Sequence, residues 1–306
     1  WITLESPTVS EMAVGLGLDW IVIDAEHGHL DWSEIVAHLR STVRSDTVVL
    51  VRISELSESL VKRALDLGAD GIVIPSVNDA SQLSRAIAAA NYPPRGMRGI
   101  GAERATGWGS CFAQHAGDCN GRILVVPLIE SIQAAKNMES IVSVDGCELF
   151  FFGPADFSAT AGAVGQWETP DVRHQILHCK EMILRAGKSC GVVATDPQNL
   201  IERRQQGFQM LGLGLDAGLL LRSVTETLRA AGVFRALTPE LKPMKLATTE
   251  HPLERPPGNF RPHRHESVQG VSEAPDMELD AGVTLRVQVG DRIGAKKLMT
   301  GIVTFD

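Results

Sequence analysis

The sequence predicts an α/β fold, namely a TIM (β/α)8 barrel with an extra C-terminal extension. Short apolar runs alternate with amphipathic stretches along most of the 306 residues. The runs are continuously apolar, as strands buried on both faces of a parallel sheet are. There are about eight strand–helix units of about 25 to 30 residues each, which is the count and spacing of such a barrel.

The expected strands are short runs rich in β-branched and aromatic residues. They cover Trp1–Leu4, Leu18–Asp24, Thr47–Ile53, Gly71–Val77, Arg122–Ile129, Cys147–Phe152, Ser189–Ala194 and Phe208–Leu213. The expected helices are amphipathic stretches, several of which begin at a capping residue or a proline. They cover Thr8–Leu16, Asp31–Val43, Ser57–Leu67, Asp79–Ala90, Ser131–Val142, Asp171–Ala186, Pro197–Gln206 and Ala217–Ala231. The segment Asn91–Gly121 is a long loop, and long loops in compact folds are usually functional.

A doubly wound open sheet is a less favoured alternative. That fold would need fewer strands and usually a glycine-rich phosphate turn after the first strand. This chain has Glu5-Ser6-Pro7 at that place.

Residues 1–236 are expected to form the barrel domain, and residues 237–306 a C-terminal extension of unknown role. The prolines between Pro239 and Pro262 predict an extended arm rather than a helix or sheet. The stretch His263–Glu266 has His-x-His spacing, but a solvated turn is the favoured interpretation over a metal site. A late hairpin is expected from Thr284–Val289 and Leu298–Phe305.

Composition points to a small-molecule partner. The net charge of −8 and the isoelectric point near 5.6 argue against a nucleic-acid or anionic-membrane surface, which needs clustered Lys and Arg. No apolar run approaches the roughly 20 residues of a membrane helix. The cysteines form no CxxC pair, so buried free thiols in a reducing compartment, the cytoplasm, are expected. They are Cys111, Cys119, Cys147, Cys179 and Cys190.

The stretch Leu149–Ala159, LFFFGPADFSA, carries the first catalytic candidate. Its apolar half is a buried strand, which Gly153 and Pro154 end. Asp156 then stands at the carboxyl end of the strand, where α/β enzymes keep their working groups. Asp156 could equally cap the next helix, and this stretch alone leaves both readings open.

Other charged residues also follow expected strands. Asp24 ends the second strand and Glu26 and His27 follow it, Arg52 lies in the third, Glu130 follows the fifth and Asp156 follows the sixth. The carboxyl ends of barrel strands converge on one face, so these charges should gather there. A ring of carboxylates needs a cation, and hard oxygen ligands favour Mg²⁺ or Mn²⁺. Taken singly, each residue has a structural alternative, such as an ion pair for Arg52 or a helix cap for Glu130.

These motifs resemble the HpcH/HpaI aldolase family of divalent-metal, pyruvate-specific class II aldolases. The resemblance spans about residues 1 to 234 and carries its motifs in order. They are DWIVIDAEHG (Asp19–Gly28), VLVRI (Val49–Ile53), ALDLGADGIVIP (Ala64–Pro75), YPPRGMRGIG (Tyr92–Gly101), PLIES (Pro127–Ser131) and FFGPADFSA (Phe151–Ala159).

The resemblance implies roles for particular residues. Glu130 and Asp156 would bind the metal, with Mg²⁺ expected and Mn²⁺ or Co²⁺ as alternatives. Arg52 would contact the oxo and carboxylate end of the substrate, and His27 would be the acid/base. The remaining expected site residues are Asp24 and Asp66 among the catalytic groups, and Gly153, Pro154, Ala155, Arg104 and Trp1 among the substrate-binding groups. The backbone of Gly153–Ala155 would receive the pyruvate carboxylate.

The expected reaction is reversible cleavage of a 4-hydroxy-2-oxo acid to pyruvate and an aldehyde through a metal-bound enolate. A 2-oxo acid can chelate a metal that acts as a Lewis acid on its carbonyl. No lysine stands among these strand-end residues to form a Schiff base. Citrate-synthase-like condensation, decarboxylation or cyclisation on the same fold remains an alternative. A non-catalytic metabolite-binding or assembly module is an alternative of a different class.

The resemblance also implies an assembly. Asp66 lies late in an outer helix, away from the strand ends of its own chain, and would pair with His27 of a neighbouring subunit. The last helix, Ala217–Ala231, begins with an apolar run that favours packing against a partner. A homo-oligomer, a hexamer built as a trimer of dimers, is therefore expected.

Overall fold

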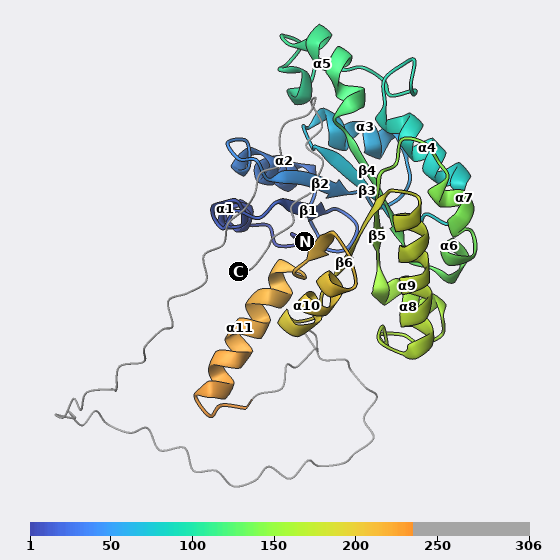
Figure 1. Ribbon diagram of the computed structural model, residues 1–306. Coiled ribbons are helices and arrows are strands. Elements are labelled where there is room, and N and C mark those ends of the chain that lie inside the picture. The colour runs from blue at the N-terminus through green and yellow to red at the C-terminus, as the bar shows by residue number, and fades with distance from the viewer. Residues whose placement is uncertain (235–306) are drawn as a thin grey trace, which may run out of the picture.

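The computed structural model describes residues 1–234. The expectations for the extension, namely the proline-rich arm, His263–Glu266 and the late hairpin, lie outside the described residues. The described chain is a parallel α/β fold around one seven-stranded sheet. Its strands lie in chain order, each hydrogen-bonded to the next, and the helices cover the outer side of the curled sheet (Figure 1).

The strands are close to those expected from the sequence. They are β1 (Trp20–Asp24), β2 (Val48–Arg52), β3 (Gly71–Ile74), β4 (Leu124–Ile129), β5 (Leu149–Phe152), β6 (Ser189–Val193) and β7 (Met210–Gly212). Every neighbouring pair is parallel, for example Asp24 opposite Arg52 in β1 and β2. The long connections that parallel strands require are supplied by helices.

The helices include those expected, with Ser131–Val142 divided at Asn137 into two helices, and two others. They are α1 (Pro7–Gly15), α2 (Trp32–Ser41), α3 (Glu58–Asp66), α4 (Ala80–Ala90), α5 (Phe112–Asp118), α6 (Ile132–Lys136), α7 (Met138–Val142), α8 (Pro154–Thr160), α9 (Pro170–Arg185), α10 (Pro197–Gln205) and α11 (Asp216–Ala230), with 3₁₀ turns η1 (Arg104–Thr106) and η2 (Cys119–Gly121). Asp31 and Asp79 cap α2 and α4 with their side chains. The structure adds α5, within the long loop, and α8, directly after β5.

The first expected strand, Trp1–Leu4, forms only an isolated parallel bridge between Ile2 and Ile23. Ile2 N donates to Val22 O at 2.7 Å, and Asp24 N donates to Ile2 O at 3.0 Å. The ladder stops there because the Asp216 carboxylate takes the next backbone N–H groups, those of Thr3 and Leu4. The eight-stranded barrel predicted from the sequence is thus seen as seven strands and a bridge.

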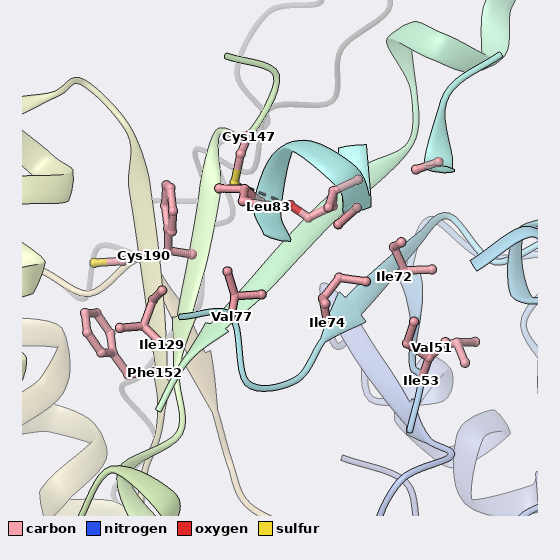
Figure 2. Close-up of a cluster of buried hydrophobic side chains, with 14 of the residues drawn as sticks. Val51, Ile53, Ile72, Ile74, Val77, Leu83, Ile129, Cys147, Phe152 and Cys190 are labelled. Carbon is pink, nitrogen blue, oxygen red and sulfur yellow. Dashed lines mark hydrogen bonds between the residues drawn. The ribbon is translucent and has the colours of Figure 1, made fainter. Parts of the chain in front are cut away.

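The apolar side chains form two clusters, one on each side of the sheet. Figure 2 shows part of the outer cluster, including Val51, Ile72, Ile129 and Phe152, between the sheet and its helices. The smaller inner cluster lies within the curl and consists of Val22, Leu50, Val73, Val126, Leu128, Leu149, Phe151 and Met210. Strand side chains alternate between faces. Asp24 and Arg52, two residues beyond Val22 and Leu50, therefore face the inside of the curl.

Four of the five cysteines are buried and all five are free thiols, as expected, whereas Cys111 is exposed. Burial raises the pKa of Cys147 and of Cys190 to about 12. Within residues 1–234, no helix is both long and apolar enough to cross a membrane.

Candidate active site

A buried ion pair lies where β1 and β2 end. Arg52 Nε donates to Asp24 Oδ1 at 2.8 Å, and Arg52 Nη2 donates to Asp24 Oδ2. Asp24 is 0% exposed, and its Oδ1 also accepts the backbone N–H groups of Glu26 and His27. All of these contacts hold the guanidinium and the following turn in place. Asp24, expected among the catalytic groups, thus contacts both Arg52 and the turn that carries Glu26 and His27.

Arg52 keeps donors for a further partner. A guanidinium has five N–H groups, and Asp24 takes two of them. Nη1 lies 3.0 Å from Glu26 Oε2, and the guanidinium carbon lies 4.7 Å from the centre of the Trp1 ring. A planar donor fixed on one edge and stacked on one face offers its remaining N–H groups in a defined direction. That geometry suits a carboxylate or an oxo group.

Glu130 directly follows β4, and its carboxylate is closely packed against Ser76 and Gly153. Ser76 N donates to Glu130 Oε1 at 2.6 Å, and Ser76 Oγ lies 3.3 Å from the same oxygen. A Cβ added at Gly153 would lie 2.5 Å from Glu130 Oε2, so only glycine lets this carboxylate sit against the start of α8. Glu130 is 6% exposed. The orientation of the carboxylate is set by the Ser76 N–H, which donates to Oε1, and by the Gly153 backbone, which lies beside Oε2.

Asp156 lies in the first turn of α8 and is exposed. Gly153, not Asp156, occupies the N-cap position of this helix. The capping alternative for Asp156 is therefore wrong, although the carboxylate still complements the positive end of the helix dipole. Burial is the main cause of the raised pKa of Glu130 and of Glu26, and the charge of Asp156 adds to it in both, so Asp156 lies near these two carboxylates.

We call Asp24, Glu26, Glu130 and Asp156 the carboxylate rim. The pKa of Glu130 is raised, chiefly by burial and further by Asp156 and Glu26, while the Ser76 hydrogen bond and Arg52 act in the opposite direction. The pKa of Glu26 is also raised, again chiefly by burial, against the charges of Arg52 and His27. The rim thus holds negative charge that Arg52 does not fully offset.

The carboxylates fit a divalent cation. Burial is the largest cause of the raised pKa of Glu130, and the charges of Asp156 and Glu26 add to it; a cation beside Glu130 and Asp156 would relieve this second contribution. Mg²⁺ is commonly held by one or two carboxylates and takes its other ligands from water and substrate. Residues 1–234 contain no group of three or more His, Cys, Asp or Glu side chains arranged to hold a metal ion.

His27 is exposed on the turn after β1, with its backbone N–H bound to Asp24 Oδ1 at 3.1 Å. Its charge lowers the pKa of Glu26, so the imidazole lies close to the rim. Trp1, half-buried, stacks edge-on against Phe151 of the inner cluster at 5.7 Å between ring centres. The structure thus brings His27, Trp1 and Arg52 together with the rim.

Asp66 and Arg104 lie at the other end of the fold. Asp66 ends α3, just before β3 begins, so it lies near the amino ends of the strands. Arg98 Nη2 donates to Asp66 Oδ1 at 2.7 Å. Arg104 Nη1 donates to Leu67 O, the carbonyl after α3, at 2.6 Å. Within one chain, the structure does not bring either residue to the carboxylate rim.

Sequence reasoning missed Ser76 as a site residue. Ser76 contributes its backbone N–H, a group that every residue except proline has and that no sequence pattern reveals. Its φ of 53° also places a non-glycine residue in the left-handed region. Such conformations concentrate at functional sites. The sequence places Glu26 at the strand ends without a role, and its ion pair with Arg52 emerges only from the fold.

Fold and site together define a class of protein. This is a parallel α/β enzyme whose carboxylates, buried arginine and histidine gather at the carboxyl ends of the strands, where such folds bind substrates.

Comparisons with known proteins identify the family. Residues 1–223 match the family model described as HpcH/HpaI aldolase/citrate lyase. The chain is 33% identical over 228 residues to a hydroxypyruvate/pyruvate aldolase of Paraburkholderia phytofirmans, covering 74% of this chain and 85% of that one. It is 31% identical over 230 residues to a 4-hydroxy-2-oxovalerate aldolase of Novosphingobium aromaticivorans, covering 75% and 87%.

Solved structures of the same family have a similar fold. An HpcH/HpaI aldolase/citrate lyase family protein from Burkholderia cenocepacia J2315 superposes with a TM-score of 0.73 at 28% identity, covering 76% of this chain and 93% of that one. An HpcH/HpaI aldolase from Desulfitobacterium hafniense DCB-2 gives 0.70 at 27% identity, covering 77% and 92%. The chain belongs to the HpcH/HpaI aldolase/citrate lyase family. The expectation of a carbon–carbon lyase of the aldolase kind is thereby confirmed.

Proposed function

We propose that this chain is a class II pyruvate aldolase that reversibly cleaves a 4-hydroxy-2-oxo acid to pyruvate and an aldehyde. The observation that carries the proposal is the juxtaposition of the Glu130 and Asp156 carboxylates with the free donors of a rigidly held Arg52. Support for this substrate class comes from relatives named 4-hydroxy-2-oxovalerate aldolase, hydroxypyruvate/pyruvate aldolase and 2-keto-3-deoxy-L-rhamnonate aldolase.

Glu130 and Asp156 would hold a divalent metal, with Mg²⁺ preferred on the hardness of the ligands. Bound there, the metal supplies Lewis-acid polarisation of the 2-oxo group. Glu130 is already oriented for this role by Ser76 and Gly153. Asp156 lies in the first turn of α8, close enough for its charge to act on the Glu130 carboxylate.

Arg52 stabilises the negative charge that develops on the 2-oxo oxygen when the carbon–carbon bond breaks. Its guanidinium is immobilised by Asp24 and stacked on Trp1, so little reorganisation is needed during the reaction. A preorganised donor of this kind is worth about 2–4 kcal/mol in the transition state. Asp24 contributes by holding Arg52 in position.

His27 moves the proton. In the cleavage direction it takes the proton of the 4-hydroxyl group, and in the condensation direction it returns it. Its exposure suits a group that meets the aldehyde half of the substrate.

The substrate carboxylate would be received at the start of α8. Gly153 N donates to Ile129 O at 3.3 Å, and Pro154 has no N–H. Of the expected stretch Gly153–Ala155, Ala155 therefore offers the donor. The first turn of a helix favours an anion there.

A pyruvate-release assay tests the proposed function. Protein stripped of metal and then reloaded with Mg²⁺, Mn²⁺ or Co²⁺ should cleave 4-hydroxy-2-oxo acids only after reloading. A panel of aldehydes run in the condensation direction would identify the acceptor. Turnover by rigorously metal-free protein would refute the class II assignment.

We also propose that the curled sheet is a complete (β/α)8 barrel with Trp1–Thr3 in the place of the eighth strand. Support comes from hydrogen bonds on both sides of this segment. On one side Ile2 bridges to β1, and on the other Trp1 N donates to Gly214 O and Asp216 N donates to Trp1 O, each at 3.0 Å. The segment thus joins β1 to the residues that follow β7.

We further propose a homo-oligomer, a hexamer built as a trimer of dimers, with sites shared between subunits. Support comes from α11, in which Asp216 is the one buried residue. The helix leaves apolar side chains in solvent, with Leu220 60% exposed and Val224 48% exposed. An apolar face of this kind favours a partner. Asp66, distant from its own rim, would then meet His27 of the neighbouring subunit.

Subunit mixing tests the shared site. His27→Ala should lose about 10²- to 10⁴-fold in turnover, the usual contribution of an acid/base group, and Asp66→Ala should also be impaired. Mixed under exchange conditions, the two variants should regain part of the activity, because some interfaces then carry both intact residues. No recovery despite demonstrated subunit exchange would confine the site to one chain.

A further inference from the structure

The orientation of Glu130 depends on an unusual backbone at Ser76. The Ser76 N–H points at Glu130 Oε1 because Ser76 adopts a φ of 53°. A left-handed conformation is energetically unfavourable for a non-glycine residue and persists only where surrounding contacts enforce it. Some other group must therefore hold the Ser76 peptide.

Asn78 supplies that contact. Its side-chain Nδ2 donates to Ser76 O at 2.9 Å, two residues back along the loop between β3 and α4. Its side-chain Oδ1 accepts from Ser131 Oγ. Ser131 directly follows Glu130 in the chain. The Asn78 side-chain amide thus links Ser76, which donates to the Glu130 carboxylate, to Ser131, the residue after Glu130.

Asn78 is itself fixed from two sides. Asn78 N donates to Gln82 Oε1 at 2.6 Å, and Asn137 Nδ2 donates to Asn78 O at 2.8 Å. Ser131 Oγ also accepts from Ala134 N, which anchors it to the start of α6. The network therefore ties α4, α6 and the segment before α7 to the turn that carries Glu130.

We propose that Asn78 is a positioning residue that fixes the Glu130 carboxylate for metal binding by holding Ser76 in its left-handed conformation and Ser131 against the same loop. This proposal rests on the proposed role of Glu130 as a metal ligand. Groups that orient metal ligands typically contribute about 10–100-fold to metal affinity.

The first test is direct metal binding. Asn78→Ala should weaken Mn²⁺ affinity, measured by titration of the metal-free protein, about 10- to 100-fold. Asn120→Ala is the matched control. Asn120 Nδ2 also donates to a backbone carbonyl, Tyr92 O, at 2.9 Å, but it lies in η2, away from the carboxylate rim. That control should leave Mn²⁺ affinity unchanged.

A rescue separates positioning from general loss of structure. Glycine adopts positive φ without the steric cost that serine pays. The double variant Asn78→Ala/Ser76→Gly should therefore recover much of the lost Mn²⁺ affinity, since the residue 76 N–H can again point at Glu130. If Asn78→Ala proves too unstable for titration, Asn78→Ser removes the same Nδ2 donor and carries the same expectation, including rescue by Ser76→Gly.

Glu130→Gln shows which hypothesis has failed. Unchanged Mn²⁺ affinity in Glu130→Gln would overturn the metal-ligand role in the proposed function. A loss in Glu130→Gln with none in Asn78→Ala, or an Asn78→Ala loss that Ser76→Gly does not relieve, would overturn the positioning role of Asn78 alone.

Discussion

Two buried arginines in this fold have nearly the same immediate contacts but lie at opposite ends of the sheet. Arg52 pairs with Asp24 and stacks on Trp1, with its guanidinium carbon 4.7 Å from the ring centre. Arg98 pairs with Asp66 at 2.7 Å and stacks on Tyr92 at 4.5 Å. Both arginines are less than a tenth exposed.

Their wider surroundings differ. Arg52 lies in a strand, beside three further carboxylates, and its charge lowers the pKa of Glu26 and Glu130 against the effect of burial. Arg98 lies in the loop after α4, and its second partner is the thiol of Cys119, with Nη1 3.3 Å from Sγ. The Arg98 pair shows that the same immediate contacts also occur away from the carboxylate rim. What distinguishes the Arg52 pair is the group of further carboxylates around it at the strand ends.

The largest effect is expected from removing carboxylates of the rim, which the surroundings of Arg98 lack. Glu130→Gln and Asp156→Asn should each abolish pyruvate release, because an amide is a poorer ligand than a carboxylate for a hard cation. Circular dichroism and thermal melting should show an intact fold. Asp118→Asn, which removes an exposed carboxylate paired with Arg122, is the control and should keep full activity. Near-native turnover of either rim variant at limiting metal would refute the ligand assignment.

The two arginines can be compared directly by the same substitution. Arg52→Lys should lower kcat/KM by about 10²- to 10³-fold, because a point charge cannot replace a planar donor in the transition state. Arg98→Lys should cost about tenfold or less, since a lysine can still pair with Asp66. Steady-state kinetics on both variants give the answer. Near-normal constants for Arg52→Lys would remove Arg52 from the site, and equal losses would give the two pairs equal importance in catalysis.

The smallest expected effect concerns pH and stability. Burial raises the pKa of Glu130, so the folded metal-free protein favours the protonated form. The contribution of Glu130 to the free energy of unfolding is therefore largest at pH values below the pKa that it has in the unfolded chain. That contribution is lost as the pH rises through the higher pKa of the folded protein. The change that Glu130→Gln makes to the free energy of unfolding of the metal-free protein should therefore be more favourable at pH 7 than at pH 4.

Urea unfolding at the two pH values measures this difference. Glu139→Gln, which removes an exposed carboxylate from α7, is the control for the loss of one negative charge. A Glu130→Gln effect that is independent of pH would contradict the raised pKa.

The sequence by itself determined most of the fold and supplied the residues that we propose for the site. An apolar run such as Leu149–Phe152 favours a strand buried on both faces of a parallel sheet, and the order of strands and helices follows from their alternation. Because the carboxyl ends of parallel strands converge, the positions of these runs also predict that Asp24, Arg52 and Glu130 lie at one edge of the sheet. The motifs around them were specific enough to indicate the family.

Only the tertiary structure decided how those groups act. The Asp24 carboxylate is engaged by Arg52, the Ser76 backbone is aimed at Glu130, and Asp66 is paired with Arg98 across a loop. These contacts join residues 28, 54 and 32 positions apart. The sequence could not reveal them because hydrogen bonds between distant segments depend on backbone direction and on burial, which are set only when the sheet and its helices pack together.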